Sequence, residues 1–296
     1  MYNISVGGIC MDSFSLTSEN PIIAAEYEKS NYYIEELSSL SNKCIIFCSG
    51  NGIYYPNDEI TFRKTVIDSN RYEWQNLSKA NVIKKFAAKI IYIRDLYKAW
   101  YLLGINKDLS SIDAIVDFLQ EQTKGYDVIT VGNSSGAYMS TLLALKLNAT
   151  MCFNFCGQFI LDAGWTKLYS KEYQYNSLIP LLEENKETVI NYFYPYYCEN
   201  DQIQAAYLDK ISNIHIFPIK ESVHGITLLN FSIPKLITLS STKFIELGEK
   251  YKSKTAISKL SFCIASIGIV GSITEFSHYV LSKINYLYRT KIRKNI

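Results

Sequence analysis

Short apolar runs alternate with longer amphipathic stretches along most of this chain, and that rhythm limits the folds open to it. Six of the runs have the length and composition of strands, at residues 43–48, 88–93, 126–131, 151–155, 189–194 and 214–219. Residues 112–121 have helical spacing, and residues 137–147 are small and apolar in the way of a buried helix. Buried strands separated by helices are typical of a sheet covered on both faces. The sequence therefore predicts an α/β fold with a doubly wound, mainly parallel sheet.

The length and apolar content suffice for one large domain. The chain has 296 residues, of which 48% are hydrophobic. We predict one domain over residues 1–250 and a tail over 251–296. Residues 157–187 are less regular and contain several aromatic residues, among them Trp165, Tyr169, Tyr173 and Tyr175. They could form a lid over a site, although packing on the domain surface is the commoner role and the one that we favour.

Charge and cysteine usage exclude several classes of protein. The 30 basic and 28 acidic side chains leave a net charge of +2, so the chain lacks the strong positive field of nucleic-acid-binding proteins. The seven cysteines are odd in number and lack the repeated short spacings of zinc sites. Cys44 and Cys48, like Cys152 and Cys156, lie in strand-like runs where buried free thiols are common. We therefore expect a reducing compartment, no nucleic-acid partner and no bound metal.

The two ends of the chain bear on its location. Residues 1–8 lack the basic flank and long apolar stretch of a secretory signal, so we expect a cytoplasmic protein. Residues 260–274 carry no charge, but a run of about 15 residues is shorter than the roughly 20 that span a bilayer. After Glu275 the chain has basic residues and no acid. We favour an apolar helix docked on the domain with a solvated basic end; peripheral contact with the inner face of a membrane, or with a protein partner, is the alternative.

A glycine-flanked serine lies between a predicted strand and a predicted helix. The sequence Gly132-Asn133-Ser134-Ser135-Gly136 follows residues 126–131 and precedes residues 137–147. A nucleophile elbow requires this strand, turn and helix, because the glycines permit a sharp turn and the serine hydroxyl projects near the positive end of the helix. A phosphate-binding loop is disfavoured, since no Walker-type lysine follows. We predict Ser134 as a nucleophile.

A serine hydroxyl is a weak nucleophile until a base accepts its proton, and histidine suits that role near neutral pH. Of the three histidines, His215 lies inside a predicted strand and His278 lies in the tail. His224 follows the last predicted strand in a loop, where an arrangement of this kind presents its base. We predict His224 as the base.

The third member should be a carboxylate between the serine and the histidine in the chain. Asp201 follows the strand at 189–194 and begins a stretch that has the character of a helix N-terminus. It would hold His224 in the required tautomer and stabilise the imidazolium. Glu199 is the rival, and helix capping is the structural alternative for Asp201. We favour Asp201.

An oxyanion needs two preorganised hydrogen-bond donors. One would be the backbone N–H of Ser135, the residue after the nucleophile. The other would come from the loop that follows the strand at 43–48, from Gly50, Asn51 or Gly52. The sequence leaves these three open.

With Ser134, Asp201 and His224 in this order, residues 43–231 resemble the α/β-hydrolase superfamily. The similarity lies in architecture and spacing, and residues 131–138, 194–206 and 224–225 look like the corresponding stretches of bacterial esterases and acyl hydrolases. Some of those are found with surface-polysaccharide biosynthesis, and some resemble the serine-hydrolase-like component of accessory secretion systems. The chain departs from the family in having Ser49-Gly50-Asn51-Gly52 instead of a His-Gly-Gly type loop.

The resemblance implies a serine hydrolase of the carboxylesterase type that needs no cofactor and acts on a small-molecule or glycan ester, with a bacterial glycoconjugate as a candidate. An O-acyltransferase that uses the same triad is the alternative among enzymes, because the superfamily contains both. A non-catalytic hydrolase-fold scaffold in a membrane-associated assembly is the alternative from another class. Sequence does not separate hydrolysis from transfer.

Overall fold

The computed structural model describes residues 20–37, 40–161, 174–209, 211–225, 228–252 and 256–294. In the last helix, side chains are described as far as residue 281 and at Ile284. The expectation for residues 1–8 lies outside these ranges. So do residues 162–173 of the predicted aromatic stretch, which include Trp165, Tyr169 and Tyr173.

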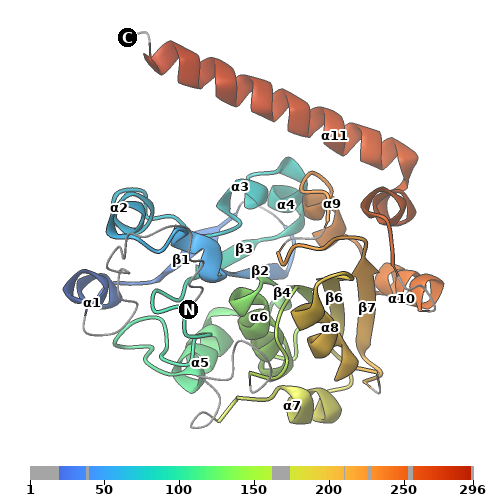
Figure 1. Ribbon diagram of the computed structural model, residues 1–296, viewed down its shortest axis with the longest axis horizontal. Helices are drawn as coiled ribbons and strands as arrows, with labels where there is room; N and C mark the ends of the chain where they lie inside the picture. Colours follow the sequence, from blue (N-terminus) through green and yellow to red (C-terminus); the bar gives the residue numbers. More distant parts are fainter. Residues whose placement is uncertain are drawn as a thin grey trace, which may run out of the picture.

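A seven-stranded sheet forms the centre of the molecule (Figure 1). Its strands are β1 (Tyr32–Glu36), β2 (Lys43–Cys48), β3 (Lys89–Ile93), β4 (Asp127–Asn133), β5 (Met151–Phe155), β6 (Val189–Pro195) and β7 (Ile214–Ile219). They lie in the order β1-β3-β2-β4-β5-β6-β7. β1 pairs antiparallel with β3, and every other neighbouring pair is parallel. The predicted mainly parallel sheet is confirmed.

Helices cover both faces of this sheet (Figure 1). One face is covered by α5 (Ile112–Gln122), α6 (Ser135–Lys146), α7 (Ile179–Glu184) and α8 (Glu199–Ala206). The other is covered by α3 (Gln75–Ser78), α4 (Asn81–Phe86), α9 (Ile233–Ile237), α10 (Ser241–Tyr251) and the start of α11 (Lys259–Lys294). The elements α1 (Pro21–Tyr27), η1 (Asn51–Tyr54), α2 (Glu59–Phe62) and η2 (Arg63–Asp68) form a smaller cluster with the loop after β3.

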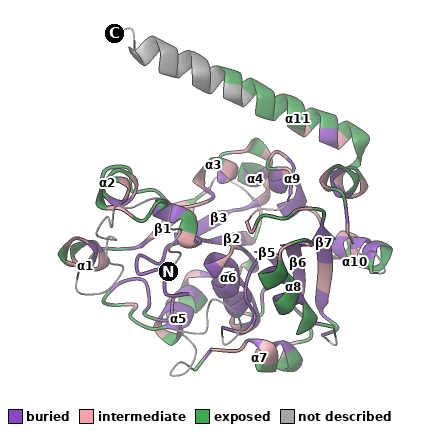
Figure 2. Ribbon diagram, viewed as in Figure 1, coloured by how far each residue is buried: buried purple, intermediate pink, exposed green. Residues whose placement is uncertain are grey.

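The strands of the sheet are largely buried (Figure 2), and the alternation of side chains along each strand divides the interior into two cores. In β2, Cys44 and Ile46 face α5 and α6, whereas Ile45 and Phe47 face the opposite helices. All four are fully buried. Each fully buried large apolar side chain contributes about 1.5–3 kcal/mol relative to an exposed one, so a strand with two buried faces is stabilised from both sides.

Local signals explain the two predicted helices. The side chain of Ser111 accepts a hydrogen bond from the Ala114 N–H at 3.1 Å, and this N-cap starts α5 at the predicted place. α5 is amphipathic and buries only one side. α6 is buried along almost its whole length because it crosses the middle of the sheet, which is why its sequence consists of small and apolar residues.

Two elements differ from the sequence-based expectation. The edge strand β1 was not predicted, because its half-exposed sequence Tyr32–Glu36 lacks a continuous apolar run. α11 is much longer than the uncharged run at 260–274, and Gly268, with φ 76° and ψ 168°, interrupts it. Its part Lys259–Leu281 has the length and composition of a membrane span, the single such helix in the described part of the chain.

Candidate active site

Ser134 lies on the turn between β4 and α6, at the carboxyl edge of the sheet. Its backbone has φ 55° and ψ −122°, an uncommon conformation for a residue other than glycine. The Ser134 N–H donates to the carbonyl of Phe155 at the end of β5, at 2.9 Å. This bond fixes the strained turn and leaves the side chain at the N-terminus of α6, where the helix dipole favours negative charge.

The two glycines of the pentapeptide are required by close backbone contacts. A Cβ atom on Gly132 would lie 2.1 Å from the carbonyl oxygen of Gly136. One on Gly136 would lie 2.4 Å from the carbonyl oxygen of Cys48 in β2. The turn therefore has no room for a side chain at either position, as the sequence predicted.

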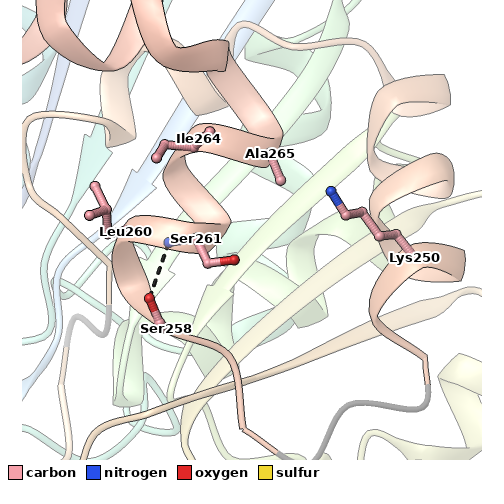
Figure 3. A pocket seen from close by; sticks show the side chains of 6 residues that line it. All are labelled: Lys250, Ser258, Leu260, Ser261, Ile264 and Ala265. Carbon is pink, nitrogen blue, oxygen red and sulfur yellow. Dashed lines mark hydrogen bonds between the residues drawn. The ribbon is translucent and has the colours of Figure 1, made fainter.

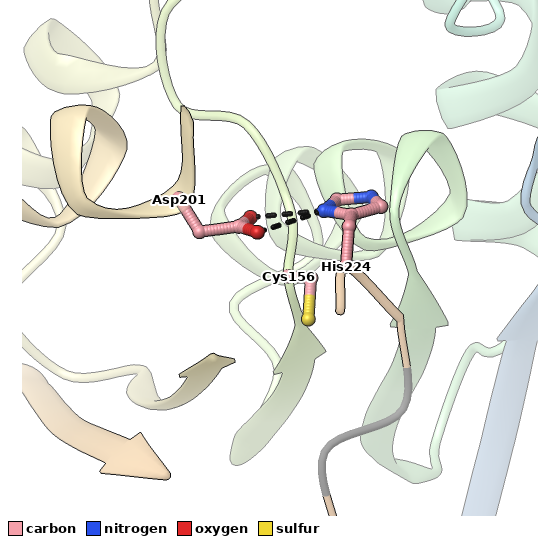
Figure 4. Close-up of side chains that lie close together, drawn as sticks. All are labelled: Cys156, Asp201 and His224. Atoms are coloured by element: carbon pink, nitrogen blue, oxygen red, sulfur yellow. Dashed lines mark hydrogen bonds and ion pairs between the residues drawn. The ribbon is translucent and has the colours of Figure 1, made fainter. Parts of the chain in front are cut away.

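The structure brings the side chains of Ser134, His224 and Asp201 together. The Oγ atom of Ser134 lies 2.9 Å from Nε2 of His224. Nδ1 of the same ring lies 3.0 and 2.9 Å from the two carboxylate oxygens of Asp201, which face it in Figure 4. The three residues follow β4, β6 and β7, and these parallel strands end at the same edge of the sheet.

Burial distinguishes the two carboxylates considered for the third position. Asp201 is in the first turn of α8 and is 1% exposed, whereas Glu199 begins the same helix and is exposed. The His224 side chain is 25% exposed, so the imidazole lies between a buried anion and the solvent-accessible side of the site. Asp201 is thus the carboxylate that faces His224.

A buried thiol anchors the loop that carries His224. The Sγ atom of Cys156, directly after β5, donates to the carbonyl of Gly225 at 2.5 Å. Gly225 has φ 140°, so the loop turns sharply beside the histidine. Cys152 lies close to Cys156 in the sequence, but its thiol lies elsewhere, 3.6 Å from the Thr141 hydroxyl and under α6.

One group of side chains in the described residues has ligand atoms close enough to hold a metal ion, namely Cys156, Asp201 and His224 (Figure 4). Their ligand atoms lie within 4.8 Å of one another. However, desolvation and the nearby Asp201 raise the pKa of the Cys156 thiol well above its usual range, and metals bind the thiolate. A metal would also displace the two hydrogen bonds between Asp201 and His224. The group therefore fits a positioning network better than a metal centre.

The loop predicted to supply an oxyanion donor is held by hydrogen bonds to three other segments of the chain. The Gly50 N–H donates to Oε2 of Glu73 at 2.6 Å. The buried Ser135 hydroxyl donates to Oδ1 of Asn51 at 2.8 Å, and Nδ2 of Asn51 donates to the Lys98 carbonyl at 3.3 Å. The Gly50 amide is thus bonded to a carboxylate. The amides of Asn51 and Gly52 begin η1, where the first N–H groups lack a partner within the helix.

Three ionisable side chains near this loop were not predicted from the sequence. Desolvation raises the pKa of Glu73 and raises that of Asp95 to about 6. Desolvation also lowers the pKa of Lys98 to about 7, although its ammonium group lies 3.6 Å from the centre of the Tyr54 ring and donates to Asn57. Asp95 lies two residues after the predicted strand at 88–93, which is the one signal that could have drawn attention to it.

The other two histidines lie in unrelated surroundings. His215 is within β7 and packs against Gly248 of α10, where a Cβ atom would lie 2.3 Å from its Nδ1. Burial lowers the pKa of this imidazole. His278 is exposed on α11. Tyr175, from the predicted aromatic stretch, is buried and its hydroxyl donates to Asp113 of α5 at 2.5 Å, so this residue packs on the domain.

No family model matches the chain, and no curated protein matches it. Among solved structures, it is similar to MenH from S. aureus, with 13% identity over 75% of this chain and all of that one, and a TM-score of 0.42. It is also similar to Est1E from Butyrivibrio proteoclasticus, with 10% identity over 74% of this chain and 94% of that one, and a TM-score of 0.43. It is similar as well to the glycosylation associate protein (Gap123) complex from Streptococcus agalactiae, with 17% identity over 63% of this chain and 39% of that one, and a TM-score of 0.43.

Likenesses at these identities and TM-scores carry no argument about activity, and the fold assignment stands on the features of the chain itself. Those features are a mainly parallel seven-stranded sheet, a strained serine turn between a central strand and a buried helix, and the chain order serine, aspartate, histidine at one sheet edge. The chain therefore has the α/β-hydrolase fold.

Proposed function

We propose that the protein is a serine hydrolase that cleaves a carboxylic ester through an acyl-enzyme. The observation that carries this proposal is the 2.9 Å approach of Ser134 Oγ to Nε2 of a histidine whose other nitrogen is held by Asp201. An imidazole that donates its Nδ1 proton to Asp201 presents Nε2 as an acceptor, which is the tautomer that a general base requires.

The reaction follows from that arrangement in two halves. His224 accepts the proton of the Ser134 hydroxyl while the serine oxygen bonds to the ester carbonyl carbon, and the same proton then goes to the leaving alcohol. Water attacks the acyl-serine with His224 again as base, and this releases the acid and restores the serine. Asp201 stabilises the imidazolium in both halves.

The proposed oxyanion site combines the Ser135 amide with an amide of the loop after β2. Because the Gly50 N–H is bonded to Glu73, we assign the second donor to Asn51 or Gly52. Glu73 and the Asn51–Ser135 contact would hold that loop in place before substrate arrives.

A fluorophosphonate probe tests the proposal, because it reacts with a serine only when a base activates it. We expect the probe to label Ser134 in the folded chain and to leave Ser134→Ala unlabelled. Asp201→Asn should slow turnover of a p-nitrophenyl ester by about 10⁴-fold, because it favours the wrong tautomer of His224. Glu199→Gln, a matched change two residues away on the exposed side of α8, should keep wild-type turnover.

Absence of labelling at Ser134 in correctly folded protein would refute the proposed chemistry. Equal turnover by Asp201→Asn and Glu199→Gln would refute the role of Asp201. Within the ester class, our prediction for the substrate is an acylated glycan of bacterial origin. Release of free acid from acylated sugars, compared with transfer of the acyl group to an added sugar acceptor, separates the proposed hydrolase from an acyltransferase.

A further inference from the structure

The last helix begins as part of the domain and then leaves it (Figure 1). Phe262 and Cys263 in its first turns are buried, and the Phe262 ring packs edge-on against Phe193 and Phe217 at centroid distances of 5.4 and 5.0 Å. At Gly268 the backbone departs from helical geometry, and the helix changes direction. Residues 269–294 therefore form a separate rod of 26 residues, about 39 Å long at 1.5 Å per residue.

Figure 2 shows most of the described part of this rod as exposed, and its exposed residues include large apolar ones. Those exposed by more than a third, apart from Phe276 and Tyr279, are Ile269, Val270, Ile273, Val280, Leu281 and Ile284. At 3.6 residues per turn these six occupy one side of the helix, and Thr274, His278 and the charged Glu275 lie on another. Phe276 lies at the boundary, where its ring meets that of Phe231 at 5.5 Å. The rod therefore exposes an apolar side to solvent, and an exposed apolar surface of this kind marks an interaction site.

The charge of the rod identifies the kind of surface that would cover it. Residues 283–294 contain Lys283, Arg289, Lys291, Arg293 and Lys294, and no acid follows Glu275. An apolar side next to a basic segment is complementary to an anionic lipid surface, where apolar side chains enter the acyl boundary and cations meet the headgroups. Two parallel copies of the rod would instead bring two basic segments together.

A hollow lies beside the start of α11 (Figure 3) and extends the exposed apolar and basic surface of the rod. It has a volume of about 440 Å³ and is lined by Lys250, Ser258, Leu260, Ser261, Ile264 and Ala265. Leu260 and Ile264 are 58% and 38% exposed, so apolar surface continues onto the docked segment. The Lys250 side chain, from α10, extends toward it and supplies a further cation.

We propose that residues 269–294 bind in the plane of an anionic membrane and hold the domain at its surface. The helix binds along the surface and does not cross the bilayer, for two reasons. Phe262 and Cys263 are fixed in the core, so the first third of the apolar stretch is not free to enter lipid. The remainder carries Glu275 and His278, which would be costly at the bilayer centre but are accommodated on the polar side of an interfacial helix.

Flotation of the full-length chain with vesicles tests this proposal. We expect binding to vesicles of phosphatidylcholine mixed with phosphatidylglycerol and much weaker binding to phosphatidylcholine alone. Ile273→Glu should weaken binding at least about tenfold, because it places a charge on the apolar side. His278→Glu, which adds the same side chain on the exposed polar side, should weaken it several-fold less.

The basic segment is tested separately from the apolar side. The triple change Arg289→Gln, Lys291→Gln and Arg293→Gln should weaken binding to anionic vesicles about a hundredfold and reduce its salt dependence. Fluorophosphonate labelling of Ser134, measured on the same samples, should be unchanged in every variant, so failure of membrane binding and failure of the proposed chemistry are distinguishable.

Five results would overturn the proposal. The wild-type chain does not float with anionic vesicles, or it binds neutral vesicles equally well. Ile273→Glu and His278→Glu have equal effects, or Ile273→Glu converts a dimer of the chain into a monomer, which would assign the apolar side to a second copy. Bound protein that resists extraction by alkaline carbonate would instead show a spanning helix.

Discussion

The Asp95 carboxylate accepts three backbone N–H bonds, from Tyr97, Ala99 and Tyr101, at 3.0, 2.7 and 2.9 Å. Lys98 and Tyr101 in this loop have positive φ values of 53° and 61°. The carboxylate therefore holds an unusual backbone conformation in the loop after β3. Its burial, at 3% exposure, outweighs these hydrogen bonds and raises its pKa from 3.8 to about 6.

This shift predicts a pH dependence of stability. Because the folded-state pKa lies above the unfolded value, the folded protein binds more protons between pH 3.8 and about 6. The contribution of Asp95 to the free energy of unfolding is fully present below pH 3.8 and is lost as pH rises to about 6, a change of about 3 kcal/mol. Urea denaturation from pH 4 to pH 7 measures it by comparison with Asp95→Asn, which does not titrate.

The matched variant also controls for the other carboxylates of the chain. Asp95→Asn is expected to be less stable overall, because its amide nitrogen meets a backbone N–H donor. Only the difference between the two pH profiles reports on Asp95. Parallel profiles for the two proteins would contradict the raised pKa.

Residues of the candidate site differed in how far sequence alone could predict them. Ser134, Asp201 and His224 each follow a buried strand, and their chain order is the one that this fold uses. Glu73 has no such signal, since it precedes a four-residue helix and reaches the Gly50 amide only through folding. Cys156 has the sequence context of any buried thiol, and only the fold brings its Sγ atom to the Gly225 carbonyl.

At the scale of elements, the packing of α6 against β2 depends on the absence of a side chain at Gly136. A Cβ atom on Gly136 would meet the Cys48 backbone at 2.4 Å, and backbone atoms within a sheet have no room to move away. Gly136→Ala should therefore destabilise the fold by about 1–3 kcal/mol, as overpacking in a core does. It should also misplace Ser134 and reduce probe labelling.

Gly271→Ala is the matched control for this substitution. Gly271 also lies in a helix, but a Cβ atom there would meet the nearest atom, the Ile267 Cβ, at 3.5 Å, an ordinary contact. Alanine should therefore stabilise α11 by up to about 1 kcal/mol. Urea midpoints of the two variants separate the steric effect from helix propensity, and a neutral Gly136→Ala would show that the close approach is relieved elsewhere.

The strands that could be predicted from the sequence are those buried on both faces of the sheet. The six strands read as apolar runs are all present because strands covered on both sides have no polar alternation to obscure them. β1 escaped prediction for the opposite reason, since it is an edge strand with two glutamates and a partly exposed surface. The kink at Gly268 could not be predicted, because glycine in an apolar helix is compatible with a straight one.

At the scale of the whole molecule, α11 combines packing in the core, before the kink, with the proposed membrane binding, after it. Substitutions can separate the two. Phe262 is fully buried against the sheet, whereas Phe276 beyond the kink is 52% exposed. Phe262→Ala should lower the free energy of unfolding by about 3–5 kcal/mol. Phe276→Ala should lower it by less than about 1 kcal/mol, as surface changes do, and should weaken vesicle binding.

Calorimetry and flotation on the same two variants check this division. A large loss of stability in Phe276→Ala would mean that the rod is packed on the domain in solution. Unchanged stability in Phe262→Ala would mean that the first segment is not part of the core and is free to enter lipid.

By itself, the sequence indicated the six parallel strands, two of the covering helices, and Ser134 and His224 with either Asp201 or Glu199 as candidates, because strand length, helical period and chain order are local or linear properties. Tertiary structure decided what depends on distance between segments far apart in the chain. It selected Asp201 over Glu199, bonded the Gly50 amide to Glu73, and fixed Phe262 in the core while exposing Ile273. The sequence does not distinguish an apolar residue in the core from one on the surface, so only the fold shows which apolar residues are exposed.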